Sequence, residues 1–255
     1  MKRILAVLFA VCLYVASAQA ETSTNTDTLW HTWYSSPVFT DGAFSGTMFR
    51  NFEGNSQDAP TLLVQVDMTA GVFDTGIRAY YTAAHVSSIH PKYWVSAIYD
   101  VTVTSGTGKW WVGPKINVNF DGWPTDWYEN YIVENSNETP GQWDSVLLGL
   151  GGTYLGQTYN NGANYKHYYV PWVTWHQLWA VRQSYRSGGA VDVKRIMRFW
   201  QTNGAHQMPN HYDVNEIRIN VEVSGAMDME VDIHSVYIPE DYTSEPEPKF
   251  TPCIR

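Results

Sequence analysis

Strict alternation of apolar and polar residues is the feature of this sequence that most constrains its fold. Between 216 and 223, Ile217, Ile219, Val221 and Val223 alternate with polar residues, so an extended strand there would have one apolar and one polar face. Other segments show the same alternation or are rich in β-branched and aromatic residues, with Gly, Asn, Pro and Asp between them. They are residues 61–67, 77–83, 97–104, 115–120, 129–134, 178–183 and 229–237. So many short strands predict an all-β fold, either a sandwich or a jelly roll.

One segment breaks the alternation and predicts a helix. The side chain of Asp192 can cap a helix, and Ile196, Phe199 and Trp200 recur at helical spacing on one face. Gly204 follows as a stop signal. We therefore expect one helix inside an otherwise β chain.

The two ends of the chain differ in composition from the part between them. Residues 1–20 begin with Lys2 and Arg3, continue with a short apolar run and end in Ala-Gln-Ala, which is typical of a secretory signal peptide. Residues 239–255 are rich in Pro and Glu and predict a mobile tail. We expect a secreted protein with one domain at 21–238. Cys253 is then alone in the mature chain, without an intrachain disulfide.

Charge and aromatic content narrow the possible partners. The formal net charge is −9, which is a poor match for nucleic acid or for an anionic membrane surface. The chain also contains 12 Trp and 17 Tyr, and each polar ring tip needs a partner when it is buried. This composition predicts a groove in which aromatic rings stack on sugars, with an aromatic-rich β core as the alternative.

Three segments carry polar groups that could form one site. In each of them, alternation places the polar side chains on a single face of the expected strand. An ordinary solvent-facing strand would show the same pattern at 216–223, so that segment alone does not establish a site. The residues concerned are Glu216, Arg218, Asn220 and Glu222 on the first segment, Glu129 and Tyr131 on the second, and Gln177 and Trp179 on the third.

Several motifs match one known family. They are Tyr-Glu-Asn-Tyr-Ile-Val-Glu-Asn at 128–135, Gly-Gly-Thr-Tyr at 151–154, Gln-Leu-Trp-Ala-Val-Arg-Gln at 177–183 with the turn that follows, and the Phe-Trp pair at 199–200. Together they resemble family 11 of the glycoside hydrolases, the β-1,4-xylanases, strongly over 127–204 and more weakly over 106–126 and 206–237. The resemblance implies a two-sheet β-jelly-roll sandwich with a curved cleft and one α-helix.

The resemblance also implies roles for individual residues. Glu129 matches the nucleophile, Glu222 matches the acid/base, and Tyr131, Gln177 and Trp179 match residues that contact substrate or line the cleft. A retaining glycosidase needs two such carboxyls about 5–5.5 Å apart, and their proximity raises the pKa of one of them. No metal or cofactor is required. Further candidates for substrate contact are Phe120, Glu216, Arg218 and Asn220.

The chain departs from the family pattern at several positions. Asn130 follows the nucleophile where the family has an aromatic residue, and Phe120 and Glu216 stand where it has tyrosines. The thumb loop, expected at 160–174, lacks the family's Pro-Ser-Ile turn and its arginine. Aromatic residues take their place, and we expect some of them to stack on sugar. These candidates are Trp110, Trp111, Trp123 and the aromatic residues between Tyr165 and Trp172.

Two glutamates compete for the part of acid/base. Glu216 and Glu222 share one face but lie about 20 Å apart on an extended strand, so they cannot both flank one glycosidic bond. The spacing from Glu129 and the turn at Ser224-Gly225 favour Glu222. Arg218 lies between them and would lower the pKa of a carboxylate that it paired with.

The sequence therefore predicts a secreted, monomeric, retaining hydrolase that acts on internal β-1,4 linkages of xylan. A catalytically weak or inactive carbohydrate-binding relative is one alternative, because the thumb motif is missing. An endo-β-1,4-glucanase is the other. The expected partner is a polysaccharide, with no nucleic acid and no membrane.

Overall fold

The computed structural model describes residues 29–49, 61–80, 94–119, 127–172, 175–203 and 213–237. The predicted signal peptide, the predicted tail, Phe120 and Trp123 lie outside these residues. The strands are β1 (Leu29–Phe49), β2 (Thr61–Tyr80), β3 (Trp94–Gly106), β4 (Lys109–Asn119), β5 (Trp127–Val133), β6 (Asn135–Ser136), β7 (Thr153–Asn160), β8 (Ala163–Pro171), β9 (Trp175–Arg182), β10 (Gly188–Asp192), β11 (Asp213–Ser224) and β12 (Met227–Tyr237). The helices are α2 (Pro140–Gly149) and α3 (Val193–Asn203).

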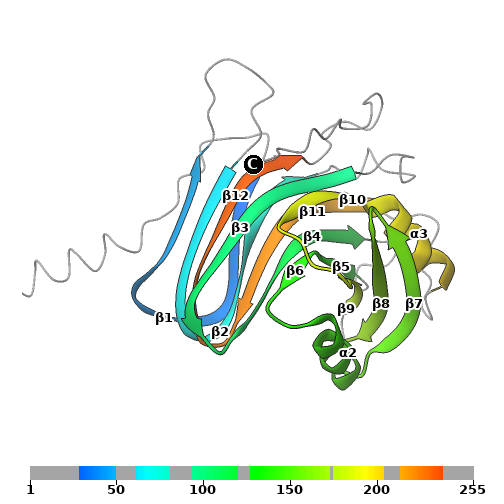
Figure 1. Ribbon diagram of the computed structural model, residues 1–255, viewed down its shortest axis with the longest axis horizontal. Helices are drawn as coiled ribbons and strands as arrows, with labels where there is room; N and C mark the ends of the chain where they lie inside the picture. Colours follow the sequence, from blue (N-terminus) through cyan, green and yellow to red (C-terminus); the bar gives the residue numbers. More distant parts are fainter. Residues whose placement is uncertain are drawn as a thin grey trace, which may run out of the picture.

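All of these strands belong to one hydrogen-bonded sheet that curves back on itself (Figure 1). Its order is β10-β3-β12-β2-β11-β4-β5-β9-β8-β7, with β1 on β2 and β6 on β4. The long strand β2 joins the two parts of the sheet, because its first half pairs with β12 and its second half with β11. The predicted all-β jelly roll is therefore confirmed, with its two layers joined through shared strands.

A large apolar core fills the inside of the curved sheet. Ile217, Ile219, Val221 and Val223 of β11 all lie in it, as their alternation predicts. Residues from β2, β3, β4, β12 and α3 pack around them, including the fully buried Trp200. Burying apolar surface of this kind stabilises the fold by about 25 cal/mol per Å². The opposite, polar face of β11 is thereby fixed toward the other side of the sheet.

The predicted helix is confirmed as α3. Asp192 caps it, since its Oδ1 accepts a hydrogen bond of 3.0 Å from the backbone N–H of Arg195. Ile196 and Trp200 are buried, and Phe199 packs partly against the core.

A second helix, α2, was not expected, so the prediction of one helix was wrong in number. Thr139 begins α2 with a capping box, in which its side chain and that of Gln142 bond each other's backbone N–H groups. Trp143 and Leu147 of α2 pack on a second apolar cluster, on the polar face of the sheet. Figure 1 shows α2 and α3 near opposite ends of the β7–β9 strands.

The segment expected to be a thumb loop is mostly strand. Asn161 and Gly162 form a tight turn, and β8 then runs between β7 and β9. Tyr165, Tyr168 and Tyr169 are buried on this strand. The prediction that these rings stack on sugar was therefore wrong, and the alternative of an aromatic-rich core holds for them.

No helix in the described segments is long and apolar enough to cross a bilayer.

Candidate active site

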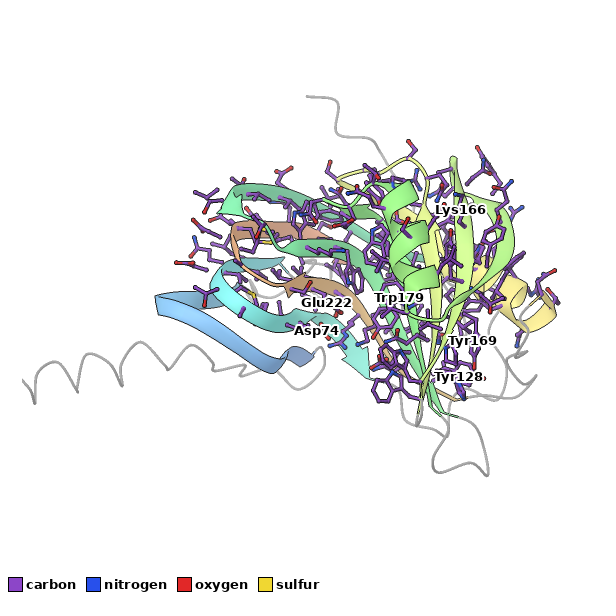
Figure 2. All side chains as sticks on the ribbon, turned by 90° about the horizontal axis from the view of Figure 1, so that it is seen from below. Asp74, Tyr128, Lys166, Tyr169, Trp179 and Glu222 are labelled. Atoms are coloured by element: carbon purple, nitrogen blue, oxygen red, sulfur yellow. The ribbon has the colours of Figure 1, made fainter. Side chains whose placement is uncertain are left out.

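Five neighbouring strands each contribute a polar or charged side chain to the same face. In sheet order they are β2, β11, β4, β5 and β9. Their contributions are Asp74, Glu222, Lys115, Glu129 and Gln177 in that order. Figure 2 shows Asp74 and Glu222 next to each other, and these two residues are register partners on β2 and β11. The three segments chosen from the sequence therefore do meet on one face.

Glu129 is held from both sides of its carboxylate. Its side chain is almost buried, with 8% of its surface exposed. The hydroxyl of Tyr131 and the amide of Gln177, at 3.3 Å, donate to Oε2. The ammonium of Lys115 lies 3.4 Å from Oε1. Donors and a cation of this kind stabilise the charged form of a carboxyl group, which is the form that a nucleophile requires.

Trp179 supports this arrangement from β9. Its ring stacks on Tyr131 at a centroid distance of 4.1 Å and packs against Trp143 of α2 at 5.3 Å. Its indole Nε1 donates to Gln177 Oε1 at 3.1 Å, which orients the Gln177 amide toward Glu129. Trp179 is 6% exposed, so the structure gives it a supporting position, and its contact with substrate stays a prediction.

Glu222 lies in a different environment from Glu129. It is half-buried, and burial raises the pKa of its carboxyl to about 7, with the negative charge of Asp74 as the second cause. Lys115 and Trp111 oppose this shift, and Glu129 adds to it. The pKa of Tyr131 is also raised, by burial and by the charges of Glu129 and Glu222. The two glutamates therefore act on the same phenol.

Two of these charged residues were missed in the sequence. Asp74 is 1% exposed, and its Oδ2 binds Arg218 Nη2 at 3.1 Å and Lys115 Nζ at 3.4 Å. Arg218 was a candidate for substrate contact, but the structure buries it against Asp74. Alternation could have placed Asp74 and Lys115 on polar strand faces. The pairing of strands that brings them together is not written in local sequence.

The backbone register bears on the competition between Glu216 and Glu222. Glu216 pairs with Asn117, which in turn pairs with Glu129, so Glu216 lies two strands away from Glu129 in the same row. Its side chain lies outside the described part of the structure. Glu222 pairs with Trp111, which lies six positions from Asn117 along β4, and its charge acts on Tyr131. The choice of Glu222 as acid/base stays a prediction that this electrostatic interaction supports.

The remaining candidates on this face are covered. Asn220 is fully buried, and its amide O and N have no hydrogen-bond partner among the described residues. Its register partners are Gly76 and Gly113, where a Cβ atom would lie about 2.0 Å from a backbone oxygen of the next strand. The strands therefore approach closely under the charged cluster. Trp111 is buried on this face and Trp110 in the core on the opposite face, which favours a packing role for both rings over an open sugar platform.

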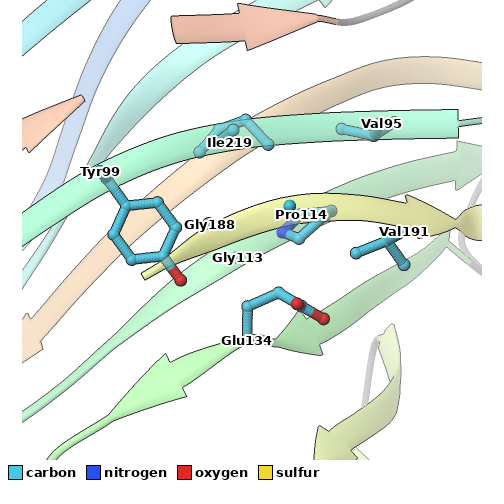
Figure 3. A pocket seen from close by; sticks show the side chains of 10 residues that line it. Val95, Tyr99, Gly113, Pro114, Glu134, Gly188, Val191 and Ile219 are labelled. Carbon is cyan, nitrogen blue, oxygen red and sulfur yellow. The ribbon is translucent and has the colours of Figure 1, made fainter. Parts of the chain in front are cut away.

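Another buried carboxylate, Glu134, lies on the core side of the sheet. Glu134 accepts hydrogen bonds from Tyr165 and, at 2.6 Å, from Arg186 Nε, and Arg182 Nη1 lies 3.7 Å away. Figure 3 shows Glu134 and Tyr99 at the edge of a small, mostly apolar pocket between β3, β10 and β4. Its volume of about 10 Å³ has room for about one water molecule, so it is not a sugar site. In the described segments, no three His, Cys, Asp or Glu side chains are placed to hold a metal ion.

The curved sheet matches the β-jelly-roll fold of family 11 xylanases. Among solved structures, the chain is similar to a loop-swap mutant of Neocallimastix patriciarum Xyn11A, with 16% identity and a TM-score of 0.61 over 87% of this chain and 97% of that one. A family 11 xylanase from the same organism has 15% identity and a TM-score of 0.56, over 85% of this chain and 97% of that one. A mutant of the ENZbleach xylanase has 16% identity and a TM-score of 0.58, over 86% of this chain and 90% of that one. No protein-family profile matches the sequence, and at these identities the likeness shows the fold.

Proposed function

We propose that this protein is a secreted glycoside hydrolase that cleaves internal β-1,4 linkages of xylan by a retaining double displacement. The observation that carries the proposal is the contrast between two carboxyls on the same face of the sheet. Glu129 receives two donors and a cation, whereas the pKa of Glu222 is raised to about 7 by burial and by Asp74. One carboxyl with a raised pKa beside a second carboxyl that accepts hydrogen bonds is typical of the acid and the nucleophile of a glycosidase.

The proposed chemistry follows from these positions. An oxygen of Glu129 attacks the anomeric carbon while the glycosidic C–O bond breaks, and the leaving oxygen takes the proton of Glu222. Glu222 is then a carboxylate and accepts a proton from water as that water attacks the anomeric carbon. The ester bond that the first step formed between Glu129 and the anomeric carbon then breaks, and its electron pair returns to the Glu129 carboxylate. Tyr131 and Gln177 keep the carboxylate of Glu129 oriented through both steps.

Xylan is the proposed substrate because the solved structures that share this fold include xylanases. The expected signal peptide at residues 1–20 supports secretion toward such a polysaccharide. A retaining mechanism requires the carboxyl groups of Glu129 and Glu222 to lie about 5–5.5 Å apart, which a structure with a bound xylo-oligosaccharide would measure.

The test uses two substrates that differ in their need for an acid. An aryl xyloside has a leaving group that needs little protonation, whereas xylan needs much. We expect Glu222→Ala to lose far more activity on xylan than on the aryl xyloside, and azide to restore part of the aryl reaction. Glu216→Ala is the matched control on the same strand. If Glu216→Ala shows the leaving-group pattern and Glu222→Ala does not, the assignment is reversed.

A panel of xylan, mixed-linkage glucan and cellulose separates the proposed function from its alternatives. Release of reducing ends from glucan or cellulose alone would indicate an endo-β-1,4-glucanase. Saturable binding of xylan without any release of reducing ends would indicate a carbohydrate-binding relative.

A further inference from the structure

Lys115 occupies an unusual place for a lysine. It lies on the site face of β4, the strand between those that carry Glu222 and Glu129. Its side chain is 2% exposed, although a lysine is rarely buried unless its charge is paired. The chain must therefore offset the cost of removing this ammonium from water.

The contacts of Lys115 show how that cost is offset. Its Nζ lies 3.4 Å from Asp74 Oδ2 and 3.4 Å from Glu129 Oε1. It also lies 4.8 Å from the centroid of the Tyr131 ring, within the range of a cation–π contact. Among the ion pairs of the described residues, Lys115 is the cation that touches both carboxylates, whereas Arg218 pairs with Asp74.

The charges of this cluster balance at the start of the proposed reaction. With Glu222 protonated, the anions Asp74 and Glu129 face the cations Lys115 and Arg218. When Glu129 becomes an ester, it loses its charge, and Glu222 gains one by giving up its proton. The negative charge thus crosses β4 from one glutamate to the other, while Lys115 stays between them.

We infer that Lys115 is the positioning residue of the carboxylate pair: its fixed ammonium holds Glu129 and Asp74 together and serves as the counter-ion of whichever glutamate is charged. This inference rests on the proposed retaining function. A fixed counter-ion is favourable in a buried site, because an unpaired charge has a far higher free energy there than in water. The titratable groups that face Lys115 are Asp74 from β2, Glu222 with the cation Arg218 from β11, and Glu129 with Tyr131 from β5.

The test compares Lys115→Met, Asp74→Asn and the double variant by the pH dependence of kcat/KM. Without the ammonium, both glutamates bind protons more readily, so both limbs of the profile should move to higher pH in Lys115→Met. Asp74→Asn removes a negative charge instead, so both limbs should move to lower pH. The double variant loses one charge of each sign, and its limbs should return toward those of the wild type.

We expect Lys115→Met to lose at least about tenfold in kcat/KM at the wild-type optimum, since an unpaired buried carboxylate is disfavoured, and the double variant to regain several-fold. A loss of activity in Lys115→Met with unmoved limbs, or a double variant no better than Lys115→Met, would overturn the inference. If Lys115→Met does not fold, Asp74→Asn and the double variant carry the test. Removing Lys115 in that background must still move both limbs upward.

A titration without substrate distinguishes failure of this inference from failure of the proposed function. In protein with ¹³C-labelled glutamate side chains, the titration midpoint of Glu222 should rise in Lys115→Met and fall in Asp74→Asn. If the wild type hydrolyses no glycan, the proposed function fails. The titration midpoints still show whether the Lys115 ammonium acts on the charge of Glu222. Midpoints that stay unchanged in both variants would reject the inference even in an active enzyme.

Discussion

The molecule buries carboxylates in two clusters on opposite faces of one sheet, and the two clusters differ in how their charge is balanced. On the core side, Glu134 faces two guanidinium groups, from Arg182 and Arg186. On the site side, Glu129, Glu222 and Asp74 share the cations Lys115 and Arg218. The ion pairs to both guanidinium groups hold the Glu134 carboxylate in place, so that it serves as a structural anchor. Three carboxyls that share two cations leave one of them able to take up and release a proton near neutral pH.

The same amide substitution on the two faces should give the largest contrast. Glu129→Gln should reduce turnover of xylan by about 10⁴-fold or more, because an amide of the same shape is a poor nucleophile. The binding of xylan should remain nearly intact. Steady-state kinetics and a binding assay on insoluble xylan measure both quantities. Glu134→Gln is the matched control, one residue after the end of β5, and its folded form should keep most of the activity. Substantial turnover by Glu129→Gln would show that Glu129 is not the nucleophile.

Glu134→Gln should instead act on stability. The change leaves the buried guanidinium of Arg182 and the half-buried guanidinium of Arg186 without their carboxylate, and breaking a buried ion pair on one side costs about 3–5 kcal/mol. Urea unfolding of the variant and of the wild type measures this difference in the free energy of unfolding. A loss below about 1 kcal/mol would mean that Glu134 is no anchor and that the contrast between the clusters is mistaken.

The pH dependence of stability should identify the proton-binding carboxyl. The pKa of Glu222 is raised to about 7 in the folded protein, so folding binds a proton between about pH 4.5 and 7. This group therefore favours folding fully at low pH, and its contribution is lost as the pH rises through 7. In Glu222→Gln, the corresponding fall in stability, on the order of 2 kcal/mol, should be missing. Unfolding free energies at pH 4.5 and pH 8 test this, and equal pH dependence in both proteins would contradict it.

Tyr165→Phe should have the smallest effect. It removes one hydroxyl that donates to Glu134 while the ring stays packed in the core. The expected cost is about 1–2 kcal/mol in the free energy of unfolding, without a shift in the pH profile of activity. A shift of either limb of the pH profile of activity would show that the two carboxylate clusters are coupled across the sheet.

The sequence predicted the strands and the site to different degrees, for physical reasons. The alternation in β11 predicted which of its residues lie in the core and which form its polar face. Asp192 and the apolar spacing after it predicted α3. The helix α2 has two buried residues, Trp143 and Leu147, and exposes Leu148, so it lacks the apolar stripe that announces a helix. Thr139, Pro140 and Gln142 at its start were the readable signal.

Other features depended on contacts that local patterns do not contain. The strand β8 was missed because the expected thumb loop was placed on its residues. The pairing of Asp74 with Lys115 depends on the sheet order β2-β11-β4, which no local pattern specifies. A lysine on a strand face also suggests solvent exposure, whereas the neighbouring carboxylates bury Lys115. The roles of Glu129 and Glu222 came from a family resemblance, and kinetics must establish them.

The parallel pairing of β5 with β9 has a consequence for how the site assembles. The chain makes hairpins of β7 with β8 and of β8 with β9, and these contacts are local in sequence. By contrast, the bond from Gln177 to Glu129 joins residues 48 positions apart, across a crossover that contains α2, β7 and β8. Closing such a loop costs chain entropy before any contact repays it. During refolding, Glu129, the proposed nucleophile, should therefore become oriented after most of the sheet has formed, so that recovered turnover lags behind recovered strand signal.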